Sequence, residues 1–131
     1  MYHDAIRPLG WLGILTIGVL SLVPGDLRPH AAAGLITGQL EHVAAYFLTA
    51  AVLTLGYAAP THSRRIITLL TLYAGLLEIA QLWIPGRTSQ FIDFAASSVG
   101  ACIGAYAVIG FGKMGWLTRG ARSERSHGRL P

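Results

Sequence analysis

Four long apolar runs alternate with short polar segments along the chain. The runs are Leu9–Val23, Val43–Ala59, Ile66–Ile84 and Phe94–Phe111. With its flanking residues, each run reaches about 17–20 positions, the length that an α-helix needs to cross roughly 30 Å of hydrocarbon. A soluble helix bundle would have polar outer faces, which these runs lack. The pattern predicts an all-α membrane protein with transmembrane helices at about 6–23, 40–59, 66–84 and 93–111.

Basic residues gather in alternate polar segments, and this bias predicts the orientation. The connections at 24–39, 60–65 and 85–92 are short, so consecutive helices should run antiparallel in a bundle. Two arginines lie in the 60–65 connection and five of the ten Lys and Arg residues follow Phe111, whereas the other two connections hold one arginine each. By the positive-inside rule, both termini and the 60–65 connection are expected to be cytoplasmic.

Composition supports a membrane protein and divides the chain in two. Hydrophobic residues make up 53% and charged residues only 12%, whereas a soluble domain has about a quarter charged residues. We predict a four-helix transmembrane domain over 1–112 and a basic, disordered cytoplasmic tail over 113–131. The net charge of +4 comes mostly from this bias. The tail lacks a folded platform or interleaved aromatic residues, so nucleic acid is not an expected partner.

The first apolar run has a second interpretation, as a cleaved signal peptide. The small residues "HAAAG" at 30–34 vaguely resemble a cleavage site, but "PGDLRP" separates them from the run and the preceding segment is weakly basic. We favour a retained helix. The single cysteine, Cys102, lies within the fourth predicted helix and cannot form a disulfide within the chain.

Polar residues interrupt the apolar pattern on the external side only. They are Glu41 and His42 at the start of the second helix, Glu78 and Gln81 near the end of the third, Arg87 and Thr88 in the connection, and Asp93 at the start of the fourth. Glu78 and Gln81 are three residues apart and share one helix face. Glu78 lies on the order of 9 Å below the helix end. An unpartnered carboxylate there costs on the order of 2–3 kcal/mol, so it needs a partner or a proton.

Each of these residues also has a structural interpretation. Asp93 can cap its helix, and Glu41 and His42 can be interfacial residues. Gln81 can form an interhelical hydrogen bond, and Glu78 can form a structural ion pair, for which Arg87 is the nearest cation. The sequence contains no motif for zinc, serine-nucleophile or nucleotide chemistry. We therefore expect no metal and no cofactor.

The same residues carry a resemblance to a known family. "LEHVAAYFLTAAVL" (40–53) followed by "EIAQLWIPGRTSQFIDFAASSVGACIG" (78–104) resembles the VanZ-like family of small bacterial membrane proteins. The family pattern matches here at His42, Tyr46, Phe47, Glu78, Gln81, Gly86, Arg87, Thr88, Asp93, Gly100 and Gly104. Many members have asparagine where this chain has Ser97, and Asp-Lys where it has Gly38-Gln39. The resemblance implies a multi-pass protein of a bacterial inner membrane, related to one that confers teicoplanin resistance.

Three functions remain open. In the first, the protein binds an envelope amphiphile, such as a lipid-linked precursor: Arg87 holds an anionic headgroup, and Glu41, His42, Glu78, Gln81, Thr88 and Asp93 orient it or bind the ligand. In the second, the protein is a hydrolase or transferase in which Glu78, His42 and Asp93 are the candidate acid–base groups. In the third, Glu78 serves a small proton-coupled transporter that works as a homo-oligomer. A purely structural role also remains open.

Overall fold

The described residues form four helices. The computed structural model describes residues 2–24, 27, 34–57, 60–87 and 90–127, with side chains for 5–24, 27, 38–57, 62–87 and 90–112. The helices are α1 (Tyr2–Leu22), α2 (Gly34–Tyr57), α3 (Pro60–Gln81) and α4 (Phe91–His127). No strand occurs in these segments. The prediction of an all-α fold with four helices is confirmed.

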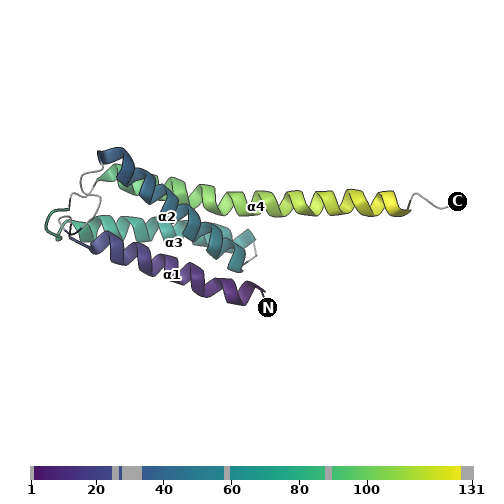
Figure 1. Ribbon diagram of the computed structural model, residues 1–131, viewed down its shortest axis with the longest axis horizontal. Helices are drawn as coiled ribbons and strands as arrows, with labels where there is room; N and C mark the ends of the chain where they lie inside the picture. The colour runs from purple at the N-terminus through teal and green to yellow at the C-terminus, as the bar shows by residue number, and fades with distance from the viewer. Residues whose placement is uncertain (1, 25–26, 28–33, 58–59, 88–89, 128–131) are drawn as a thin grey trace.

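Consecutive helices run antiparallel (Figure 1). The ends of α1 and α3 therefore lie beside the starts of α2 and α4, and we call this the polar end. The starts of α1 and α3 lie beside the end of α2, and we call this the basic end because Arg7, Arg64 and Arg65 lie there. The helix α4 passes the basic end and extends beyond the other helices (Figure 1). Which side of a membrane each end faces stays a prediction.

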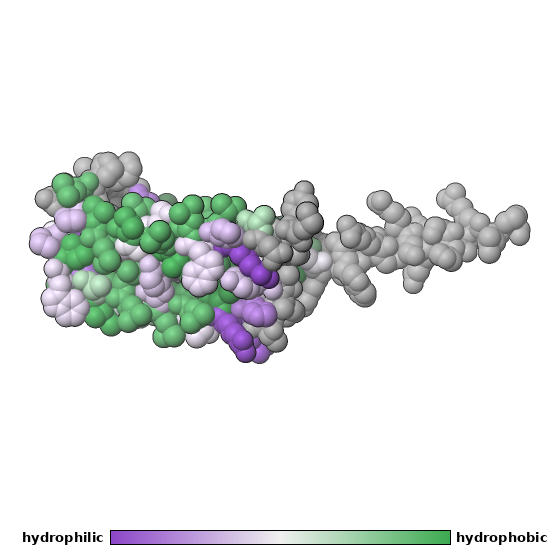
Figure 2. Space-filling view, turned by 90° about the horizontal axis from the view of Figure 1, so that it is seen from below, coloured by the Kyte–Doolittle hydropathy of each residue, from purple (hydrophilic) through white to green (hydrophobic). Residues whose placement is uncertain are grey.

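Three of the four helices are long and apolar enough to cross a membrane. These stretches are Ala5–Leu22, Gly38–Tyr57 and Phe91–Gly112. Large apolar side chains point outward from all four helices, as for Leu9 (58% exposed), Leu69 (65%) and Ile103 (52%), and apolar side chains cover most of the face in Figure 2. Helix α3 does not meet the same standard because polar and charged residues lie at both of its ends. That α3 also crosses the membrane stays a prediction.

The tightest helix contact joins α2 and α4. Gly100 and Gly104 lie one turn apart on α4 and face the backbone of Val43 and Phe47 on α2. A Cβ atom added to either glycine would lie 3.0 Å from the Cα atom of its α2 neighbour, closer than packing allows. Small residues on one face permit this close approach between helices. Ala101 and Ala105 are fully buried beside them, so α2 and α4 form the rigid part that carries the polar end.

Helix α3 ends three residues earlier than the apolar pattern predicts. The predicted span reached residue 84, but α3 ends at Gln81. The amide groups of Leu82, Trp83 and Ile84 instead donate to the carbonyls three residues before them, in tight turns. Pro85 disfavours helical backbone in the residue before it, and Gly86 adopts a positive φ of 72° that glycine tolerates well. The chain then turns back toward α1.

Helix α4 continues through residues that we expect to be a tail. Its backbone is helical to His127, without a proline between Phe91 and that residue. The expected disorder of 113–131 in the membrane-bound protein stays a prediction. Helix α1 packs against α2 and α3, since the Tyr73 hydroxyl donates to the Ile14 carbonyl at 3.0 Å. Retention of α1 in the mature protein likewise stays a prediction.

Candidate functional site

Helix α3 brings Glu78 and Gln81 to the inside of the polar end. They continue the buried face of Ala74 and Leu77, and their exposed fractions are 9% and 3%. The Glu78 carboxylate accepts a hydrogen bond through Oε2 from the backbone N–H of Gln90, at 3.0 Å. Since α4 begins at Phe91, Glu78 holds the start of that helix. The Gln81 side chain points the other way and donates through Nε2 to the Ser21 carbonyl, at 3.1 Å.

Arg87 binds the end of α1. Its Nε atom donates to the Ser21 carbonyl oxygen at 3.1 Å, and its Nη2 atom donates to the Leu20 carbonyl at 3.3 Å and also to that of Ser21. The last carbonyls of a helix lack partners within the helix and carry the negative end of its dipole. Arg87 therefore supplies both donors and positive charge to α1, and those carbonyls hold the plane of its guanidinium.

A second polar network joins α2 to α4. The His42 ring lies between two α4 side chains, with Nδ1 at 3.3 Å from the Ser97 hydroxyl and Nε2 at 4.0 Å from Oδ2 of Asp93. Asp93 and Ser97 are four residues apart and share one helix face. Ser97 is 2% exposed, whereas His42 and Asp93 are half-buried. Asp93 also lies in the first turn of α4, where a negative charge stabilises the helix.

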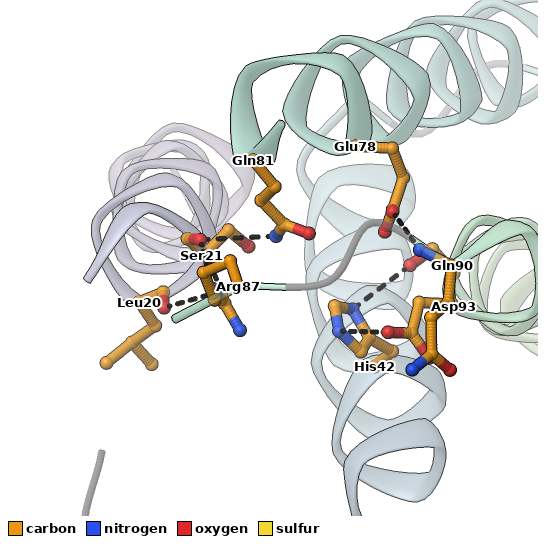
Figure 3. Close-up of polar contacts among 9 residues, drawn as sticks. Leu20, Ser21, His42, Glu78, Gln81, Arg87, Gln90 and Asp93 are labelled. Atoms are coloured by element: carbon orange, nitrogen blue, oxygen red, sulfur yellow. Dashed lines mark hydrogen bonds and ion pairs between the residues drawn. The ribbon is translucent and has the colours of Figure 1, made fainter. Parts of the chain in front are cut away.

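The predicted site residues thus form two adjacent networks (Figure 3). One network contains Gln81 and Arg87 at the end of α1, and the other contains His42 and Asp93 between α2 and α4. Glu78 lies between them and points toward Gln90 (Figure 3). An ion pair between Glu78 and Arg87 stays a prediction, which a double-mutant cycle on the two residues tests.

Of the other two predicted ligand residues, the structure describes only Glu41. Glu41 is exposed on α2, next to His42 in the sequence. Its role in ligand binding stays a prediction. Thr88, which the sequence also assigns to the ligand site, lies outside the described residues.

Sequence reasoning did not identify three partners within these networks. The carbonyl of Ser21 and the backbone N–H of Gln90 are main-chain groups. Any residue type would supply the carbonyl, and any except proline would supply the N–H. One feature of the sequence could have identified Ser97: it lies four residues after the candidate acid Asp93, and this spacing places both side chains on one helix face. Ser97 stood out in the sequence only as a departure from the family pattern.

This arrangement supports two kinds of chemistry. A held guanidinium binds phosphate or carboxylate groups in a planar, two-point manner. A histidine between a hydroxyl and a carboxylate can accept or donate a proton. Among the side chains that the structure describes, no group of three or more His, Cys, Asp or Glu residues is placed to hold a metal ion. The expectation of no metal and no cofactor stays a prediction.

Comparison with known proteins identifies the family. A family model described as VanZ/LLP1 matches residues 11–112, which include both networks and the Gly100–Gly104 contact. No curated protein and no solved structure matches the chain. Because the family model covers most of the chain and the apolar helices agree with it, this is a VanZ-like membrane protein of a family linked to glycopeptide resistance. The chain belongs to the VanZ/LLP1 family.

Proposed function

We propose that the polar end binds an envelope amphiphile with an anionic headgroup. A lipid-linked envelope precursor is a molecule of this kind. The observation that carries this proposal is the attachment of Arg87 to the carbonyls of Leu20 and Ser21. A free arginine loses side-chain entropy when it binds a ligand, whereas a guanidinium already held in place loses less. Arg87 is half-buried at the polar end, and this position suits contact with a phosphate or carboxylate at the bilayer surface.

Exposed apolar side chains close to Arg87 in the sequence suit the rest of an amphiphile. Leu82 and Trp83 follow the end of α3 and Phe91 begins α4, and these side chains are 66%, 75% and 82% exposed. Trp and Phe at such positions lie well at the level of lipid headgroups and upper acyl chains. A ligand with its charged group at Arg87 and its hydrocarbon chain along these side chains would satisfy both kinds of surface.

The two carboxylates have supporting roles in this proposal. Glu78 holds the N–H of Gln90, so it positions the start of α4 instead of contacting an anionic ligand, which it would repel. Asp93 faces His42, which orients that ring toward the headgroup region. The ligand would enter from the external leaflet of a bacterial inner membrane, in line with the predicted orientation.

Native mass spectrometry of the protein released from mild detergent tests the proposal. The wild type should carry an amphiphile that Arg87→Ala loses and Arg87→Lys keeps only in part, because one ammonium group is a poorer match than a guanidinium for holding the α1 carbonyls and a headgroup together. Arg64→Ala removes an exposed arginine from the basic end, so it should keep this amphiphile even where the other retained lipids change. Retention of the same ligand by Arg87→Ala, in a protein of unchanged helix content, would contradict the proposal.

A second candidate function is favoured by the His42 network. The ring lies close to both a hydroxyl and a carboxylate, so the site could transfer protons during hydrolysis or group transfer. Incubation of the purified protein with its retained amphiphile at several pH values would show a product by mass. Loss of that product in His42→Gln, with the ligand still bound, supports an enzyme. An unchanged ligand at every pH supports binding alone.

A further inference from the structure

The basic end of the bundle is organised around Tyr57. Arg7 on α1 donates through Nε to the Gly56 carbonyl at 3.1 Å, and its guanidinium carbon lies 5.0 Å from the centre of the Tyr57 ring. Trp11, one turn further along α1, donates through its indole N–H to the Tyr57 hydroxyl at 3.1 Å. On the other side, the His62 ring of α3 stacks on Tyr57 with the ring centres 6.0 Å apart. Tyr57 therefore joins α1 to α3 through the end of α2.

Positive charge surrounds this aromatic group. Arg7, Arg64 and Arg65 are exposed, and the most hydrophilic side chains on the face in Figure 2 gather at this end. The carboxylates whose side chains the structure describes are Glu41, Glu78 and Asp93. All three belong to the opposite half of their helices, near the polar end. The charged side chains that the structure describes at the basic end are therefore all basic; Asp4, near the start of α1, lies outside the described side chains.

The same face continues into an apolar surface. His62 and Arg65 are three residues apart on α3, so they share a face with Leu69, Leu72 and Leu76 at helical spacing. These leucines are 65%, 60% and 65% exposed. The cationic and aromatic side chains at the start of this stripe match a phospholipid headgroup, and the leucines that follow match its acyl chain. Trp11, 57% exposed, lies at headgroup level, where indole rings are stable.

We propose that the basic end is a binding site for an anionic phospholipid of the bilayer. Arg64 and Arg65 contact the phosphate, Arg7 and Trp11 contact the glycerol region, and an acyl chain follows Leu69 and Leu72. The site differs from the polar end in residues, helix ends and membrane leaflet. Its occupant is bulk lipid of the bilayer, and the site would anchor the end of α2 and the starts of α1 and α3 at one depth.

Lipid competition in nanodiscs tests this site. The full chain is placed in nanodiscs with equal amounts of phosphatidylglycerol and phosphatidylcholine, released, and weighed with its retained lipids. The wild type should retain more phosphatidylglycerol. An arginine near a charged surface contributes about a fivefold preference, so Arg64→Gln with Arg65→Gln should reduce the preference by about 25-fold. Arg64→Lys with Arg65→Lys keeps the charges and should keep most of it.

Arg87→Ala separates the two proposals. It removes the polar-end arginine, so the phosphatidylglycerol preference that remains in this background belongs to the basic end and should be lost when Arg64→Gln and Arg65→Gln are added. The proposal is overturned if the wild type retains both lipids equally, if the double glutamine variant keeps its preference, or if Arg87→Ala alone abolishes it. Circular dichroism of each variant confirms that the compared proteins are equally helical.

Discussion

Arg87 and Ser21, 66 residues apart in the sequence, are joined by hydrogen bonds from the guanidinium to the main-chain carbonyl. Gln81 donates to the same carbonyl oxygen. One acceptor at the end of α1 therefore holds both the last residue of α3 and the turn that follows it. A headgroup bound to Arg87 would act on α1 through this contact.

Loss of Arg87 should destabilise the protein as well as its ligand site. Hydrogen bonds from charged groups contribute about 1.5–3 kcal/mol each when buried, and partial exposure reduces this. We expect Arg87→Ala to lower the free energy of unfolding by about 1–2 kcal/mol. Thermal unfolding in detergent measures this change. Gln81→Ala should have a similar effect on stability but keep the ligand, because the cation remains.

Glu78 should tolerate an amide better than truncation. Glu78→Gln keeps an oxygen that can accept from the N–H of Gln90, so we expect it to insert and fold. Glu78→Ala leaves that N–H without this acceptor, at a cost of about 1–3 kcal/mol. Limited proteolysis of the turn before α4, together with thermal unfolding, measures the difference. Equal stability of the two variants would show that the Gln90 contact contributes little.

The contact between α2 and α4 should not accept a larger residue. Gly104→Ala places a methyl group against the backbone of Phe47, and overpacking of this kind costs about 1–3 kcal/mol. Gly110→Ala is the matched control, because a Cβ atom there meets nothing within 4 Å. We expect a lower unfolding temperature for Gly104→Ala only. A drop of equal size in both variants would point to the helix backbone instead of the contact.

Cysteine labelling in whole cells tests the predicted orientation and the crossing of α3. In a Cys102→Ala background, Trp83→Cys places a thiol at a site that is 75% exposed beyond the end of α3. Arg64→Cys places a thiol near the start of α3. A membrane-impermeant reagent should label the first variant in intact cells and the second only after lysis. Labelling of both in intact cells would mean that α3 does not cross the membrane.

The helices could be predicted from the sequence because lipid imposes a length and an apolar composition on each of them. The end of α3 could not, since Leu82 and Trp83 are as apolar as the helix before them and only the local turn geometry separates the two. Pro85 was the visible signal, and its effect extends to the preceding residue. Apolar residues report burial or lipid contact but do not report where a helix ends.

The candidate site was predicted as residues but not as contacts. His42, Glu78, Gln81, Arg87 and Asp93 lie at one end of the bundle, as the alternation of helices predicts. Their partners could not be derived, because Arg87 and Gln81 bind main-chain carbonyls of α1 and Glu78 binds a main-chain N–H. The identities of the side chains in the sequence do not indicate which main-chain groups they bind. The pairing of His42 with Ser97 depends on the close approach of α2 and α4 that Gly100 and Gly104 permit.

The acceptor at position 21 has a genetic consequence. Its oxygen belongs to the main chain, so Ser21→Ala leaves it in place, and a substitution scan of α1 would report tolerance of small residues at this buried position. A one-residue deletion upstream within α1 has a different effect. It turns the end of the helix by about 100° and moves it by about 1.5 Å, which takes the carbonyl away from Arg87 while every side chain of the site is retained. Selection at this point therefore acts on the length of α1 as well as on the size of the side chain at position 21.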